Sequence, residues 1–205
     1  MLKLNLGCGT DLRPGWENVD IMPLIGIDRV CDLNEPWPWE DGSVEQVFAS
    51  DVFEHLRDKM HSMGEMWRVC CHGAICEVET PNMVYNPAAW SDPTHRTCWH
   101  PENMEYFRPG HAWYYYSPAT FITIEMEHTA FRLYWKLLAY KEHDPEMAAK
   151  HIGYEEWRAS WQGPLGFADG RDILPIQTAH FPPGELLRRA PTSEAAAKLR
   201  RDPHE

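Results

Sequence analysis

The stretch LNLGCGTDLRPGWENVDI, residues 4–21, decides the fold, because it leads from an apolar run through a glycine turn to an acid. Gly7 and Gly9 stand where the apolar run ends, and glycine lets backbone amides turn sharply and approach a ligand closely. Asp20 follows thirteen residues after Gly7, inside the next apolar run. A strand, a glycine turn and an acid at the end of the following strand are typical of nucleoside-binding sites.

Two features of the same stretch argue against a dinucleotide. A dinucleotide fingerprint needs a third glycine where this chain has Leu12, and an acid about 20 residues further on. Pro14 and Gly15 stop any long helix, so a pyrophosphate would lack the helix N-terminus that normally binds it. S-adenosylmethionine has no phosphate and offers a ribose diol to a carboxylate. The turn therefore suits a cationic, phosphate-free nucleoside, with an ordinary strand-to-loop turn as the alternative.

Composition narrows the class of protein. The 205 residues are 43% hydrophobic and 24% charged, enough for one sizeable core and an appended lobe. No run reaches the roughly 20 apolar residues of a membrane helix, and the first residues lack an export signal, so a cytoplasmic location is expected. A formal charge of -12 with scattered basic residues disfavours nucleic acid as a partner. The six cysteines form no C-x-x-C pair and are expected to be reduced and structural.

The apolar pattern predicts strands that alternate with crossovers. Short runs rich in Val, Ile, Leu and Phe occur at residues 3–6, 17–21, 28–33, 46–50 and 74–80, and at 121–127 and 131–140. The last two predict an antiparallel hairpin, and the others predict a parallel sheet with covered faces. Residues 52–69 carry apolar side chains three and four apart, which predicts a helix that His72 and Gly73 stop.

A long segment follows the fifth strand. Residues 82–118 are rich in Pro, Asn, His and aromatic residues, and only 101–107, with Pro at the first position, predicts a short helix. Such a loop is usually functional or disordered, and its aromatics argue against disorder. We therefore expect one domain over residues 1–140 with an acceptor-side lid at about 82–118. Residues 141–205 are expected to be an appendage with a frayed end, including helices at 145–161 and 193–201.

Several ordered motifs resemble a known family. LNLGCG, PGWENVDI, CDLNEPWPWEDGSVEQVFASDVFEHL and RVCCHGAICEVETPN resemble the class I S-adenosylmethionine-dependent methyltransferases, in the subgroup of small domains with a shortened first helix. The resemblance covers residues 2–82 and extends more loosely to 140. It implies an α/β, Rossmann-like three-layer sandwich: a mostly parallel seven-stranded sheet with one antiparallel strand, and the cofactor across the carboxyl ends of the strands. Residues 68–74 depart from the family's usual R-V-L-K-P-G-G, at a turn remote from the cofactor.

The resemblance also implies roles for individual residues. The residues expected to bind the cofactor are Asn5, Gly7, Cys8 and Gly9 at its methionine part, Asp20 at the ribose, Asp32 and Leu33 at the adenine, and Ser50 at the methionine end. Asp51 would face the reacting methyl, and Glu54 and His55 begin the next helix in the family's E-H-L pattern.

Simpler roles stay open for most of these side chains. Asp20 could be a surface carboxylate, and Asp32 could only cap the turn at Asn34. Asp51 and Glu54 could cap the helix, because acids are favoured in a first turn. His55 could be a structural histidine.

The second informative stretch is WSDPTHRTCWHPENMEYF, residues 90–107. The D-P-x-H pattern before an aromatic and a short helix resembles the lid of some of these small methyltransferases. His95 is therefore the candidate for removing a proton from a hydroxyl acceptor, a task that suits histidine near neutral pH. Alternatively, Asp92 and His95 fix the loop by hydrogen bonds. A metal set of Asp92, His95, His100 and His111 has no known ligand spacing, so no metal is expected.

Taken together, the sequence predicts an S-adenosylmethionine-dependent methyltransferase that acts on O or N of a small or carbohydrate-like acceptor. Its candidate catalytic residues are His95, Asp51 and His55. A non-catalytic cofactor-binding or scaffold protein on the same fold is the alternative, since fold does not fix function. A nicotinamide-dependent oxidoreductase is disfavoured by Leu12 and the short crossover. The acceptor, the oligomeric state and the role of residues 141–205 are not determined by the sequence.

Overall fold

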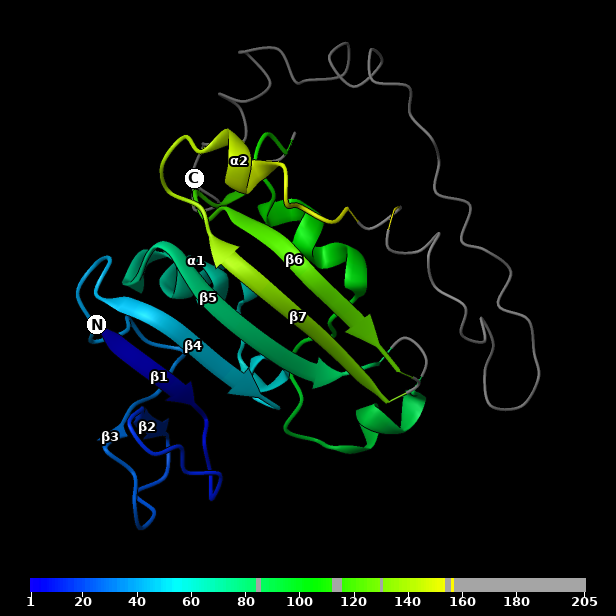
Figure 1. The fold of residues 1–205 in the computed structure, drawn as a ribbon. Helices are drawn as coiled ribbons and strands as arrows, with labels where there is room; N and C mark the ends of the chain where they lie inside the picture. The colour runs from blue at the N-terminus through cyan, green and yellow to red at the C-terminus, as the bar shows by residue number, and fades with distance from the viewer. Residues whose placement is uncertain (84–85, 112–115, 130, 154–155, 157–205) are drawn as a thin grey trace, which may run out of the picture.

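A computed structural model of the chain describes residues 1–83, 86–111, 116–129, 131–153 and 156. Its centre is a seven-stranded sheet in the order β3-β2-β1-β4-β5-β7-β6 (Figure 1). The strands are β1 (Leu2–Leu6), β2 (Glu17–Asp20), β3 (Arg29–Val30), β4 (Val44–Ser50), β5 (Cys70–Pro81), β6 (Phe121–His128) and β7 (Arg132–Ala139). β7 runs antiparallel to β5 and β6, and all other pairs of neighbouring strands are parallel. The α/β class, the mostly parallel sheet and the closing hairpin are confirmed.

The core lies on one face of this sheet, where buried side chains alternate along each strand. The register aligns Val47 of β4 with Cys76 of β5, and Cys76 with Leu137 of β7. All three are buried, and they join Met63 and Met66 of α1 (Lys59–Val69) in one hydrophobic cluster. Side chains alternate between the two faces along each strand, and the register aligns the strands, so the whole row points to the face that α1 covers.

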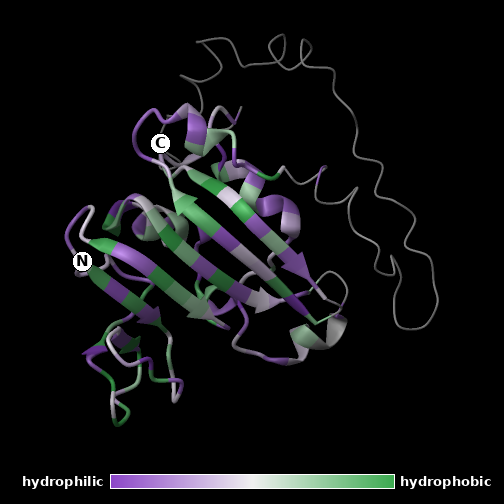
Figure 2. Ribbon diagram, viewed as in Figure 1, coloured by the Kyte–Doolittle hydropathy of each residue, from purple (hydrophilic) through white to green (hydrophobic). Residues whose placement is uncertain are grey.

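The opposite face is polar and half-exposed. Its residues alternate with the core residues, so Lys136 of β7 lies between Glu77 of β5 and Glu125 of β6 and forms ion pairs of 3.6 and 3.9 Å with them. Figure 2 shows the alternating hydrophilic and hydrophobic bands along β5 and β7. No described helix covers this face, because the chain segments that join β1 to β2 and β2 to β3 form turns without a helix.

The predicted helix at 52–69 begins later than expected. A 3-10 turn, η1 (Phe53–His55), comes first, and the α-helix starts only at Lys59. Asp58 sets this start, because its side chain accepts hydrogen bonds from the backbone amides of Met60 and His61. The helix ends at Val69, as predicted, and β5 follows at once. Gly73 therefore does not stop the helix but lies inside β5, at φ 77°, where the pairing with β4 shifts.

The remaining described elements are short. η2 (Pro87–Ser91) and η3 (Pro101–Phe107) lie between β5 and β6, and η3 confirms the predicted short helix with proline in its first turn. In the appendage, α2 covers only Pro145–Ala148, and residues 149–153 form a turn and irregular chain, so the predicted helix does not continue through them. Residues 154–155 and 157–161 of that prediction, and the predicted helix at 193–201, lie outside the described residues. No described helix has the length and apolar character needed to cross a membrane.

Candidate functional site

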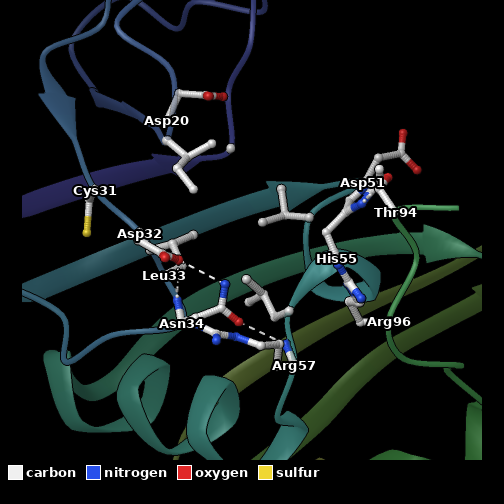
Figure 3. A pocket seen from close by; sticks show the side chains of 14 residues that line it. Asp20, Cys31, Asp32, Leu33, Asn34, Asp51, His55, Arg57, Thr94 and Arg96 are labelled. Carbon is white, nitrogen blue, oxygen red and sulfur yellow. Dashed lines mark hydrogen bonds between the residues drawn. The ribbon is translucent and has the colours of Figure 1, made fainter.

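A pocket of about 630 Å³ opens at the carboxyl ends of the parallel strands. It lies where the strand order reverses, with β1 between β2 and β4, the position at which open α/β sheets bind ligands. Its wall is formed by Gly7, Asp20, Ile21, Cys31, Asp32, Leu33, Asn34, Asp51, Val52, His55, Leu56, Arg57, Thr94 and Arg96. Figure 3 shows Asp20 at one end and Asp51, His55, Thr94 and Arg96 grouped at the other.

The glycine turn after β1 forms the floor of one end. Gly7 and Gly9 have φ values of 57° and 51°, which side-chain-bearing residues rarely adopt. A Cβ atom on Gly7 would also overlap the side chain of Val52, which follows β4. Glycine is therefore required at position 7 both by its backbone angle and by the close approach of a second pocket segment.

Asp20 is fixed at the same end of the pocket. Its Oδ2 accepts a hydrogen bond from the amide of Gly9, and its Oδ1 accepts one from the amide of Met22, both at 2.9 Å. Each carboxylate oxygen has a second lone pair, so the side chain can still accept bonds from two hydroxyl groups. The geometry agrees with ligand contact better than with a free surface carboxylate.

Asp32 both lines the pocket and builds its wall. Its Oδ1 accepts hydrogen bonds from the backbone amide and the side-chain amide of Asn34, at 2.9 and 2.8 Å. These bonds hold the pKa of Asp32 below its ordinary value. Asn34 in turn accepts a bond of 2.9 Å from the amide of Arg57, which ties the segment after β3 to the segment after η1. Asp32 thus caps the turn at Asn34, as the sequence suggested, and it also lines the pocket.

Four of the predicted cofactor residues do not line the pocket. Asn5 is buried and donates to the carbonyl of Asp11 and to the side chain of Asn18, so it fixes the glycine turn from behind. Ser50 donates to Glu79 at 2.9 Å. Cys8, whose thiol has a pKa raised by burial, and Gly9 lie in the turn itself. Contact between these residues and a cofactor stays a prediction.

Asp51 follows β4 in a strained conformation. Its φ is 56°, and it is the single non-glycine residue with positive φ among the described residues. Its side chain forms an ion pair with Arg132 of β7, and its amide donates to the carbonyl of Glu79 at 3.1 Å. Strained residues gather at functional sites. The suggested capping role is not observed, because Val52 occupies the N-cap of η1 and Asp58 that of α1.

Glu54 is fully buried in η1. Neither carboxylate oxygen has a hydrogen-bond partner among the described residues. The pKa of Glu54 is raised to about 8, mainly by burial and also by the neighbouring carboxylate of Asp51, while Arg132 opposes the shift. The backbone carbonyl of Glu54 accepts hydrogen bonds from the amides of Arg96 and Thr97, at 2.7 and 3.0 Å. These bonds fix residues 92–96, the DPTHR loop, against η1.

His55 and His95, both predicted catalytic residues, are brought together by this loop. Their rings meet edge to face with centroids 4.8 Å apart. His55 lines the pocket and its Nδ1 lies 3.0 Å from the hydroxyl of Thr94. His95 lies behind His55, with Nδ1 2.7 Å from the carbonyl of Ala89 and Nε2 3.7 Å from Asp92. The loop-fixing contact of His95 with Asp92 is therefore present as well.

The metal set considered from the sequence is not the one that the fold assembles. His100 caps η3 with its side chain. Within the described part of the chain, the residues whose possible ligand atoms lie together are Glu54, His55 and His95.

The aromatic residues of the lid divide between core and surface. Trp99 is completely buried, with edge contacts to Phe53 and Trp135, so its role is in the core. Trp90 and Tyr116 are exposed. Trp113, Tyr114 and Tyr115 lie outside the described residues.

The sequence missed the basic part of the pocket wall. Arg57 and Arg96 both line it, together with Thr94 and Ile21. Ile21 directly follows Asp20, and Thr94 and Arg96 flank His95, so proximity to predicted residues was the available signal. Arg57 was harder to predict, because it reaches the pocket only where the chain leaves η1 before α1 begins, and the sequence predicted one continuous helix there.

Comparison with known proteins identifies the fold. No protein-family model and no curated protein sequence matches the chain. Among solved structures, a chain described as a methyltransferase, in a complex with the Haloferax volcanii Trm112 methyltransferase activator, is 14% identical with a TM-score of 0.52. The alignment covers 68% of this chain and 83% of that one.

Two further structures align over similar lengths with lower scores. A chain described as a type 11 methyltransferase from Sulfolobus solfataricus is 14% identical, with a TM-score of 0.46 over 69% of this chain and 86% of that chain. A SAM dependent methyltransferase from Archaeoglobus fulgidus is 17% identical, with a TM-score of 0.45 over 68% and 86%. The strand order and the first of these alignments give the chain the fold of the class I S-adenosylmethionine-dependent methyltransferases.

Proposed function

We propose that this protein binds S-adenosylmethionine and transfers its methyl group to an oxygen or nitrogen of a small or carbohydrate-like acceptor. One observation carries the proposal: the amide of Gly9 binds the carboxylate of Asp20 at the mouth of a pocket on a methyltransferase fold. This unit offers the remaining lone pairs of a fixed carboxylate to a ribose diol.

The segment after β1 favours this cofactor over a dinucleotide. Residues 7–16, all of them described, form turns and no helix. A pyrophosphate would find neither a helix N-terminus nor its partial positive charge at this position. A sulfonium nucleoside needs neither. Asp20, Asp32 and Asp51 along the pocket wall also favour a positively charged ligand.

The other end of the pocket is suited to the acceptor. His55, Thr94 and Arg96 lie together there, across the pocket from Asp20 (Figure 3). Methyl transfer is an in-line displacement at carbon, so holding the acceptor atom against the methyl group supplies much of the rate. The His55–His95 pair is within reach of this end and would accept the proton of a hydroxyl acceptor. Arg57 and Arg96 would favour an acceptor that carries an anionic group.

Calorimetric titration tests the cofactor. S-adenosylmethionine and S-adenosylhomocysteine should each bind, whereas NAD should give no heat and no shift in thermal unfolding. Binding of NAD alone would reject the proposal in favour of an oxidoreductase.

Transfer is tested separately with the labelled methyl group of the cofactor. The His95→Ala variant should lose turnover while it keeps the affinity for S-adenosylhomocysteine, and the His61→Ala variant, at an exposed residue of α1, should keep both. Cofactor binding without methyl transfer to any pool of small-molecule or saccharide acceptors would support a scaffold protein instead.

A further inference from the structure

Three potential metal ligands converge beside the acceptor end of the pocket. One atom from each of Glu54, His55 and His95 can be chosen so that all three lie within 4.8 Å of one another. Glu54 and His55 are neighbours in η1, while His95 comes from the DPTHR loop. Two backbone bonds from this loop to the carbonyl of Glu54 fix the distance between the two segments.

The hydrogen bonds of His55 determine which nitrogen is free. Thr94 donates its single hydroxyl proton to Asp92 at 2.6 Å, so its oxygen can only accept from His55 Nδ1. A neutral His55 therefore carries its proton on Nδ1 and presents the lone pair of Nε2.

The same argument holds for His95. Its Nδ1 lies 2.7 Å from the carbonyl oxygen of Ala89, which can only accept, so Nδ1 carries the proton. In the neutral ring Nε2 carries the lone pair, and it lies 3.7 Å from Asp92 Oδ2, a contact that becomes an ion pair when the ring is protonated. A histidine that binds a metal through one ring nitrogen usually donates the N–H of the other nitrogen to a fixed oxygen, which orients the ring. Both His55 and His95 show this arrangement at Nδ1.

Glu54 provides an independent indication. Its side chain is completely buried, neither carboxylate oxygen forms a hydrogen bond of normal geometry among the described residues, and the side chain nearest in its influence is a second acid, Asp51. A buried carboxyl group without a partner is costly and rare in folded proteins. One of its carboxylate oxygens lies within 4.8 Å of a ring nitrogen of each of the two histidines.

We propose that Glu54, His55 and His95 bind one divalent first-row transition-metal ion at the pocket wall. Two imidazole nitrogens and one carboxylate suit manganese, iron, cobalt, nickel or zinc, and three protein ligands leave positions open for further oxygen ligands. Since His55 lines the pocket, those open positions would lie at its acceptor end. There, as a consequence that rests on the proposed function, the ion would bind a hydroxyl oxygen of the acceptor and make that hydroxyl more acidic, so that its proton would pass to solvent and the histidines would hold the ion in place of accepting the proton.

The test is metal binding by the full chain after treatment with a chelator. Titration with Mn²⁺, followed by loss of the free-ion resonance, and with Co²⁺, followed by visible absorption, should show a single saturable site. The Glu54→Gln variant, which keeps the shape of the side chain, should bind at least about 10-fold more weakly, as should His95→Ala. The Thr94→Val variant, which releases His55 Nδ1, should lose about 10-fold.

A matched control and a second ligand make the result decisive. His61→Ala should bind the ions as the wild type does. The proposal is overturned if the wild type shows no saturable site, or if Glu54→Gln and His95→Ala bind as tightly as the wild type. S-adenosylhomocysteine titrations on the same samples keep the two proposals apart: metal binding without cofactor binding would reject the methyltransferase function alone.

Discussion

The amide of Gly9 donates a 2.9 Å hydrogen bond to the carboxylate of Asp20, so the glycine turn after β1 and the acid at the end of β2 form one structural unit. The same carboxylate also accepts the amide of Met22. Asp20 therefore holds two loops at the pocket and presents its remaining lone pairs to a ligand. This double role leads to a prediction that separates loop positioning from charge.

We expect Asp20→Asn and Asp20→Ala to weaken S-adenosylhomocysteine binding to different extents. Asparagine can still accept the amide of Gly9 through its carbonyl oxygen but loses the charge, whereas alanine loses both. A hydrogen bond to a charged group contributes about 1.5–3 kcal/mol, so Asp20→Ala should bind about 10- to 100-fold more weakly, with Asp20→Asn between it and the wild type. Calorimetry measures both, and equal affinity of Asp20→Ala and wild type would remove Asp20 from the site.

Gly7 and Val52 give a prediction about stability. Gly7→Ala should destabilise the protein by about 2–4 kcal/mol, because the new Cβ overlaps Val52 and a side chain at φ 57° costs about 1 kcal/mol more. Val52→Ala removes the overlap but not the backbone cost. In the double variant the effects should therefore be less than additive, which urea unfolding of all four proteins would measure. Strict additivity would contradict the contact.

The sequence was sufficient for the sheet because its signals are local. Alternation along Val44–Ser50 and Arg132–Ala139 is visible in the residues themselves, and so is the glycine turn with its acid. The same alternation at Glu77, Glu79 and Lys136 already indicated a solvated face. Among the described residues no helix covers that face, because the segments after β1 and β2 are too short and too rich in proline and glycine to form one.

The helix start and half of the pocket were harder to predict, for different reasons. Asp58 was a readable N-cap, but the apolar spacing through Phe53 and Leu56 concealed the break before it. The acceptor end depends on backbone bonds from Arg96 and Thr97 to the carbonyl of Glu54. Backbone bonds between distant segments leave no trace in residue type, so the meeting of His55 and His95 required the structure.

Asp32 and Asn34 give a prediction about pH. The two hydrogen bonds from Asn34 hold the pKa of Asp32 below its ordinary value, so the carboxylate adds stability at pH above its unfolded-state pKa. That stability is lost as the pH falls through the lowered folded-state pKa. Asn34→Ala removes the side-chain bond and should raise the pKa of Asp32 toward its ordinary value. Acid unfolding linked to this group should then begin at a higher pH.

Carbon-detected NMR titration of the Asp32 carboxyl group would measure this change directly. The Asn18→Ala variant serves as a comparison, because Asn18 lowers the pKa of Asp28 in a similar way, whereas the pKa of Asp32 is lowered by Asn34. Its substitution should raise the pKa of Asp28 and leave that of Asp32 unchanged. An unchanged Asp32 titration in Asn34→Ala would contradict the role given to the side-chain bond.

Two substitutions of Asp51 separate the effect of backbone strain on stability from the effect of the carboxylate on activity. Its φ of 56° is strained for any residue with a Cβ, so Asp51→Gly should be more stable than Asp51→Ala by about 1 kcal/mol, although both lose the carboxylate. The ion pair with Arg132 does not reverse this order, because it is lost equally in both variants and is half-exposed, where such pairs contribute little. Thermal unfolding measures the difference. If Asp51 faces the reacting methyl group, as the family resemblance implies, both variants should lose methyl transfer to the same extent. Activity in the glycine variant alone would mean that the site requires the backbone conformation and not the carboxylate.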